Sequence, residues 1–232
     1  MRSTALFRRA TVAASLLLTA ALSALWVLLV PPFPATTLAQ LQQIEAGGDV
    51  AVLSATAFLV AQLPFIVAAI GVTQLIGQKS PMIAAIGGTL AVIGGFGHAA
   101  YAGFQLAVVT MASDVADHDV YARLLDGELP AIVDVLAVGG TVGTVLGLIL
   151  LGVGLLRARV GVRWIPYVLW AFVVVEFVGT GLTQWAAYAS AVLYLAALGA
   201  LAMAVWRSRL ELWTPGPMAA EPAEAAVADS RR

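Results

Sequence analysis

Six long stretches of the chain are almost entirely apolar, and polar clusters separate them. They cover about 10–30, 50–75, 82–112, 131–156, 164–184 and 187–206 of the 232 residues. Each is long enough for the roughly 20-residue helix that crosses a bilayer core of about 30 Å. Their apolar residues run continuously, whereas barrel strands would alternate apolar and polar residues. The pattern predicts an all-α polytopic membrane protein with six transmembrane helices, in a bundle over 1–210.

The first stretch follows basic residues, as the apolar part of a signal peptide does. Its apolar region of about 21 residues is longer than the roughly 7 to 15 of a signal peptide. No convincing small-residue cleavage site precedes the Pro31-Pro32-Phe33-Pro34 run. We therefore expect this stretch to remain as a permanent helix.

The two longer connections, after the first and third stretches, predict short helices. In the first, Thr37 and Gln40 match a capping box, and Gly47 and Gly48 end the run. In the second, Ser113 is placed to cap the helix. We expect both helices to lie flat over one end of the bundle. Their apolar faces are formed by Leu38, Leu41 and Ile44 in the first and by Val120, Tyr121, Leu124 and Leu125 in the second.

Composition supports the same class. The chain is 61% hydrophobic and 11% charged, with a mean hydropathy of +0.96, whereas soluble domains carry about 25% charged residues. Cysteine is absent, which excludes disulfides, thiol catalysis and cysteine-ligated metal centres. The last segment, 211–232, contains a run rich in Ala, Glu and Pro, which predicts a disordered cytoplasmic tail.

The basic residues gather in the connections on one side of the predicted bundle, and Arg123 is the exception. By the positive-inside rule this pattern places both termini in the cytoplasm and the protein in the cytoplasmic (inner) membrane. The clusters are Arg2, Arg8 and Arg9; Lys79; Arg157, Arg159 and Arg163; and Arg207, Arg209, Arg231 and Arg232.

Small residues recur at four-residue spacing in the third and fourth stretches. Small side chains let helix backbones approach closely in lipid, where no hydrophobic force drives helices together. We therefore expect these two helices to form the compact centre of the bundle; a glycine-lined substrate path is the alternative. The glycines concerned are Gly87, Gly95 and Gly103 in the third stretch and Gly139, Gly143 and Gly147 in the fourth.

Glu176 is the most informative polar residue, because it lies about midway along the fifth stretch. A charge at the centre of a membrane helix costs about 2.5 to 3.5 kcal/mol, so such residues usually face the bundle interior. His98 in the third stretch is the other ionisable residue at similar depth. The sequence predicts a midplane polar site. Its candidate residues are Glu176, His98, Gln62, Tyr101, Gln105 and Thr180.

Two readings of this site stay open. Glu176 and His98 could share a proton or form a relay, or each could bond to a neighbouring helix and fix the packing. Asp134, about one turn inside the fourth stretch, is either a helix N-terminal carboxylate favoured by the helix dipole or the outer mouth of the site. Asp114, Asp117 and His118 form a weak candidate for a divalent-metal site, with a solvated acidic loop as the favoured alternative.

Common catalytic and cofactor motifs are absent. The sequence has no P-loop and no H-E-x-x-H, and it has no basic-aromatic surface for nucleic acid. A bis-histidine haem would need a second intramembrane histidine. We therefore expect no cofactor, no enzymatic activity and no nucleic-acid partner.

The run from Leu146 to Arg157, followed by Arg163-Trp164-Ile165-Pro166, resembles a pattern in a bacterial family of uncharacterised six-helix membrane proteins of similar length. The resemblance extends to the longer connections after the first and third helices. That family has no established activity, so the resemblance implies the architecture only.

Two functions are compatible with these features. The first is a small permease or an ion- or proton-coupled transporter, with an unidentified small molecule or ion as substrate. The second is a non-catalytic membrane partner or an envelope- or stress-associated subunit whose buried polar residues serve helix packing. The expected partners are the lipid bilayer and either a second copy of the chain or another membrane protein.

Overall fold

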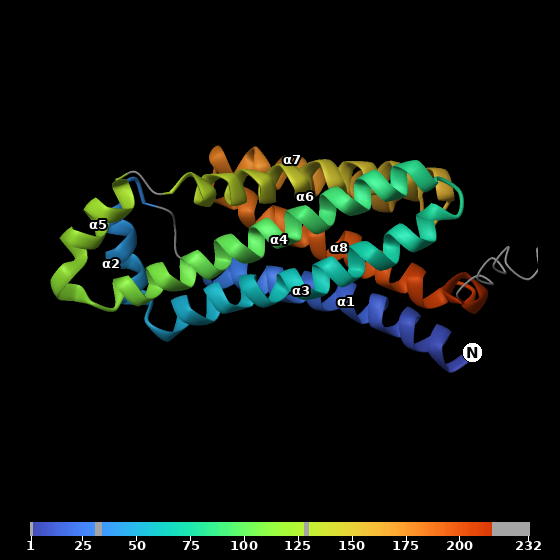
Figure 1. Cartoon of the computed structure of the whole chain (residues 1–232), viewed down its shortest axis with the longest axis horizontal. Helices are drawn as coiled ribbons and strands as arrows, with labels where there is room; N and C mark the ends of the chain where they lie inside the picture. Colours follow the sequence, from blue (N-terminus) through green and yellow to red (C-terminus); the bar gives the residue numbers. More distant parts are fainter. Residues whose placement is uncertain (1, 31–33, 128–129, 215–232) are drawn as a thin grey trace, which may run out of the picture.

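The computed structural model describes residues 2–30, 34–127 and 130–214, and in these residues six long helices run side by side (Figure 1). All six are long and apolar enough to cross a membrane, α7 when counted together with the turn that ends at Gly181. The predicted all-α fold with six spans is confirmed, and the chain is a multi-pass membrane protein in contact with lipid. The helices are α1 (Arg2–Leu29), α3 (Asp49–Gly77), α4 (Pro81–Ala112), α6 (Ala131–Ala158), α7 (Trp164–Phe177) and α8 (Trp185–Arg207).

Two short helices, α2 (Thr37–Gly47) and α5 (His118–Asp126), lie together at one end of the bundle (Figure 1). The Thr37 hydroxyl donates to the Asp126 carboxylate, and the two helices share an apolar cluster with the end of α4 that includes Leu41, Val108 and Ala112. We call this the lidded end. The start of α1 and the end of α8 lie at the opposite, terminal end.

The predicted short helices are therefore present, but both expected caps are wrong. Thr36, not Thr37, caps α2, because its hydroxyl accepts a bond from the Ala39 backbone N–H at 3.3 Å. Ser113 ends α4 and its hydroxyl donates to the Thr110 carbonyl at 2.7 Å. A turn of 3-10 helix, η1 (Val115–Asp117), separates it from α5.

Two of the four residues expected on the apolar face of α5 pack against the bundle, and the other two do not. Tyr121 and Leu125 pack against the cluster beneath α2, whereas Val120 and Leu124 are exposed. Residues at 120, 121, 124 and 125 cover two adjacent faces of a helix, and a nine-residue helix buries only one of them. The buried positions of this helix are occupied by His118 and Ala122.

The closest helix contact runs between α4 and α6. A Cβ added at Gly143 would lie 2.7 Å from the Gly94 backbone nitrogen, and one at Gly97 would lie 2.6 Å from the Cα of Gly140. No real Cβ fits at such distances, so glycine is required here. The prediction that these two helices form a compact centre is confirmed, and Gly87 and Gly147 belong to the same contact.

Three of the six predicted packing glycines lie elsewhere. Gly139 and Gly103 have no neighbouring atom within 4 Å of an added Cβ, and Gly95 faces Phe65 and Ile66 of α3. A strict four-residue spacing drifts around a helix of 3.6 residues per turn, so it leaves the contact face after two steps. The observed contact alternates steps of three and four residues, as at Gly140, Gly143 and Gly147.

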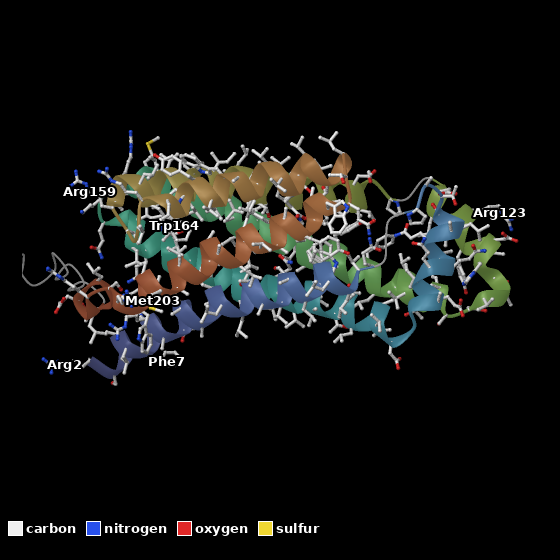
Figure 2. The ribbon with its side chains drawn as sticks, turned by 180° about the vertical axis from the view of Figure 1, so that it is seen from behind. Arg2, Phe7, Arg123, Arg159, Trp164 and Met203 are labelled. Atoms are coloured by element: carbon white, nitrogen blue, oxygen red, sulfur yellow. The ribbon has the colours of Figure 1, made fainter. Side chains whose placement is uncertain are left out.

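Charged side chains gather at the two ends of the bundle, and the side chains between them are almost all carbon (Figure 2). Arg2 and Arg159 lie at the terminal end, and Arg123 lies at the lidded end. The connections that carry Lys79 and Arg163 are also at the terminal end, because the helices alternate in direction. The predicted one-sided distribution of basic residues is present in the described part of the chain.

The fifth span is shorter than predicted. Helix α7 has 14 residues and ends at Phe177, after which Gly179–Gly181 forms a 3-10 turn, η2. At 1.5 Å per residue α7 is about 21 Å long. Glu176 is therefore one residue from the end of its helix, and its expected place midway along a continuous span is wrong. Gly179 and Gly181 permit a turn at this position.

Residues 211–214 of the predicted disordered tail are ordered. The first three belong to a 3-10 turn, η3 (Leu210–Trp213), which packs against α1, and Thr214 follows this turn. Trp213 is fully buried, and its indole N–H donates to the Ser208 hydroxyl at 2.8 Å. Burial of this large aromatic side chain favours an ordered turn, whereas a run rich in Ala and Pro has little apolar surface to bury. The rest of that predicted segment, 215–232, lies outside the described residues.

Candidate functional site

The largest cavity has a volume of about 570 Å³ and lies beneath α2, between α1, α3, α4 and α6. Its lining is mostly apolar. One wall is polar and comes from α4, where His98, Tyr101 and Gln105 follow one another along a single face. The Gln105 amide donates to the Tyr101 hydroxyl at 2.6 Å. We call this the upper cavity.

A second cavity, of about 150 Å³, is lined by both Glu176 and His98. Gln62 also lines it and is buried, and its amide donates to the Phe58 carbonyl one turn earlier at 3.0 Å. The structure thus places the two ionisable side chains, from α7 and α4, on one cavity. We call this the inner cavity.

A third cavity, of about 390 Å³, lies beside the short end of α7. Glu176 lines it together with Thr180 and the residues that lead into α8. Glu176 therefore separates this side cavity from the inner cavity. Helices α3 and α4 reach further toward α2 and α5 than α7 and α8 do (Figure 1), which leaves room at this position.

Trp26 lines all three cavities, and it begins an aromatic row that ends at His98. The ring centroids of Trp26 and Phe58 are 4.6 Å apart, and those of Phe58 and His98 are 5.9 Å apart. Both Phe58 and His98 line the upper and the inner cavity. The row is therefore the partition between the two spaces.

Glu176 is held by polar contacts within α7 and α8. The Ser190 hydroxyl donates to its carboxylate, and the Thr180 hydroxyl donates to its backbone carbonyl. His98 in turn has its ring Nδ1 3.4 Å from the Thr144 hydroxyl of α6. In the described part of the chain, these two residues bond to neighbouring helices and not to each other.

Toward the terminal end the cavities give way to tight packing. Leu16, Phe65, Leu148, Leu169 and Leu198 surround a remaining void of about 30 Å³, the size of one water molecule. These side chains belong to the main apolar core. The three cavities described above thus lie on the lidded side of this core.

The predicted polar residues are therefore divided among three neighbouring cavities, whose linings share some residues. Glu176, His98 and Gln62 meet at the inner cavity, Tyr101 and Gln105 belong to the upper cavity, and Thr180 belongs to the side cavity. Each site assignment remains a prediction, because position alone does not establish a role.

Asp134 lies outside all three linings. It is an exposed residue in the first turn of α6. A carboxylate at this position is stabilised by the positive end of the helix dipole. The structure thus favours the helix N-terminal interpretation over a place at the mouth of the site.

The acidic loop near α5 does not gather metal ligands. Within residues 2–30, 34–127 and 130–214, no three His, Asp or Glu side chains are placed to hold a metal ion. The His118 ring nitrogen is 2.8 Å from the Ala112 carbonyl oxygen. Asp114 accepts a bond from the Tyr121 hydroxyl at 3.3 Å, and its charge raises the pKa of Tyr121. Asp117 lies between Asp114 and His118 in the chain, at the end of η1.

Several lining residues carried no signal in the sequence. Trp26 near a span end is typical of an interfacial aromatic, and Ser190 stands in an Ala-rich run where a serine is common. Tyr194, which stacks on Phe172 at 4.2 Å, lines the inner cavity. The packing of α8 against both α1 and α7 brings these residues to the site.

Comparison with protein families, curated proteins and solved structures finds no match. The six-helix architecture implied by the resemblance above is present, and no family is identified.

Proposed function

We propose that this protein is a small permease, an ion- or proton-coupled transporter whose chamber opens at the lidded end. One observation carries the proposal: Glu176 and His98, from different helices, line one cavity that shares walls with two larger ones. An ionisable residue inside a membrane protein commonly marks a path for ions, protons or substrates. Here two such residues border the same space.

In this proposal Glu176 is the coupling residue. Its carboxylate faces the inner and the side cavity, so it would exchange a proton or bind a cation arriving from the lidded end. The Ser190 hydroxyl would hold the carboxylate in place. The tight core around Leu16 and Phe65 would be the closed gate of this state, and opening it would require α7 and α8 to move relative to α3.

The lidded end faces the outside in this proposal, and the protein resides in the cytoplasmic membrane of a bacterium. The basic residues support this orientation, because they gather at the terminal end and because Lys and Arg are enriched in cytoplasmic connections. The lid helices α2 and α5 would then lie over the external surface of the bundle.

Proton flux in proteoliposomes tests the coupling role. With purified protein reconstituted at a known orientation, an imposed pH gradient is expected to drive flux that Glu176→Gln lowers at least tenfold, since the amide cannot release a proton. His98→Ala should also reduce flux. Asp134→Asn is the matched control, because this carboxylate lies outside the cavities and its loss should leave flux unchanged. Equal flux in all four proteins would refute the proposal.

The second candidate is a non-catalytic membrane subunit whose polar residues hold helices together. It is favoured by the bonds from Ser190 to Glu176 and from His98 to Thr144, each of which links a pair of neighbouring helices. This function predicts no flux in the unmodified protein and a stoichiometric partner in a pull-down. It also predicts that Glu176→Leu keeps or raises thermal stability, because interhelical polar bonds are worth only about 0.6 kcal/mol on average.

A further inference from the structure

We infer that the upper cavity binds an uncharged, planar, largely apolar molecule with a hydrogen-bonding edge, the chemistry of a quinone headgroup. The inference names a substrate class and in that respect rests on the proposed transport function. Binding itself can be measured without flux, so the two claims fail separately. Four features of the cavity support the inference: its uncharged lining, its polar side chains, its aromatic row and its opening to lipid.

Among the residues that the structure describes, the lining of the upper cavity includes no Asp, Glu, Lys or Arg. A charged ligand would lose its hydration there without gaining an opposite charge, which is strongly unfavourable. The volume of about 570 Å³ lies within the range of about 300 to 1,000 Å³ typical of small-molecule sites. The cavity is therefore suited to one uncharged molecule of moderate size.

Three polar side chains of the cavity lie on the α4 wall, and the others come from α2, α3 and α6. The Tyr101 hydroxyl accepts the bond from Gln105, so its own proton is free to be donated. His98 uses one ring nitrogen toward Thr144, which leaves the other for a ligand. Successive groups on this face are about 4.5 to 6 Å apart along the helix. They form a ladder suited to a ligand whose polar atoms lie along one edge.

The aromatic row supplies the flat surface. Trp26 and Phe58 lie 32° from parallel with centroids 4.6 Å apart, and both border the cavity. Aromatic rings stack favourably on other planar groups and contribute about 0.5 to 1.5 kcal/mol beyond burial. A flat ring packed against this row would direct its edge toward the groups on α4.

The cavity also reaches the lipid-facing surface. Val138 and Val142 line it and are 61% and 47% exposed. The same exposed stripe continues along α6 to Leu146 and Ile149, which lie outside the cavity. The stripe thus faces lipid, and the cavity opens beside it. A quinone-like molecule with an apolar tail could place its head in the cavity and leave the tail in the bilayer.

Binding of a decyl-substituted benzoquinone to the purified protein in detergent tests the inference. Calorimetry should detect saturable binding, and the double variant Tyr101→Phe with Gln105→Leu should weaken it at least tenfold, since it removes two of the hydrogen-bonding groups that face the ligand. Thr110→Val is the matched control, because Thr110 is on α4 outside the cavity and bonds its own helix.

The anion of 4-decylbenzoic acid, which is similar in size and negatively charged, should bind at least tenfold more weakly than the quinone. Equal binding of the two probes, or quinone binding unchanged in the double variant, would overturn the inference. Quinone binding in a protein without proton flux would support the inference and count against transport. Flux without quinone binding would support transport and refute the inference. Unaltered melting temperatures ensure that the variants are folded.

Discussion

Replacing Gly143 with alanine is expected to destabilise the protein strongly, although alanine is the better helix former. The added Cβ would lie 2.7 Å from the Gly94 nitrogen and 2.8 Å from the Leu90 carbonyl oxygen, both backbone atoms that cannot rotate away. Overpacking of this kind costs about 1 to 3 kcal/mol, and the gain in helix propensity offsets at most about 1 kcal/mol of it. The melting temperature in detergent is the measurement.

Gly139→Ala is the matched control for this prediction. It lies one turn earlier on the same helix, and an added Cβ meets no atom within 4 Å. Its melting temperature should stay the same or rise, because only the helix propensity changes. If both variants melt at the same temperature, the close contact of α4 and α6 is not what holds the centre of the bundle together.

Replacing Ala55 with tryptophan is expected to abolish quinone binding while the fold is kept. Ala55 lines the upper cavity from α3, and the space of about 570 Å³ can take the larger side chain. The indole would occupy the position assigned to the ligand. Quinone binding should fall below detection, whereas the melting temperature should remain within a few degrees of the parent value because filling a cavity removes no contact.

Val52→Trp is the control for the occlusion. Val52 is on the same helix about one turn away, is 44% exposed, and lies outside the three cavity linings. It should retain quinone binding. Undiminished quinone binding in Ala55→Trp would show that the upper cavity is not the place where the ligand binds.

The six spans could be predicted because bilayer thickness alone sets the length of an apolar helix. Glu176 can be identified as unusual from the sequence, because the free-energy cost of a charge in lipid is predicted from the apolar residues next to it in the chain. The end of α7 was not predicted. Gly179 and Gly181 permit a turn there, but many membrane helices continue through glycine, and only the packing against α8 selects the shorter form.

The grouping of the polar residues depended on contacts that sequence spacing does not encode. Tyr101 and Gln105 share a face of α4, as the helical period requires, yet whether that face meets Glu176 is decided by Trp26 and Phe58. Those two rings separate the upper from the inner cavity. Periodicity predicts which residues point the same way along one helix, and it leaves open what another helix places between them.

The central claim is that Glu176 borders a space that solvent reaches from the lidded end. The chain has no cysteine, so a single introduced thiol can be followed without background. Ala191 lines the inner cavity beside Glu176, and Ala197, about two turns further along α8, is fully buried in the core. In intact cells, a membrane-impermeant thiol reagent should label Ala191→Cys and leave Ala197→Cys unlabelled. Labelling of neither variant, or labelling of Ala191→Cys only after permeabilisation, would contradict the account.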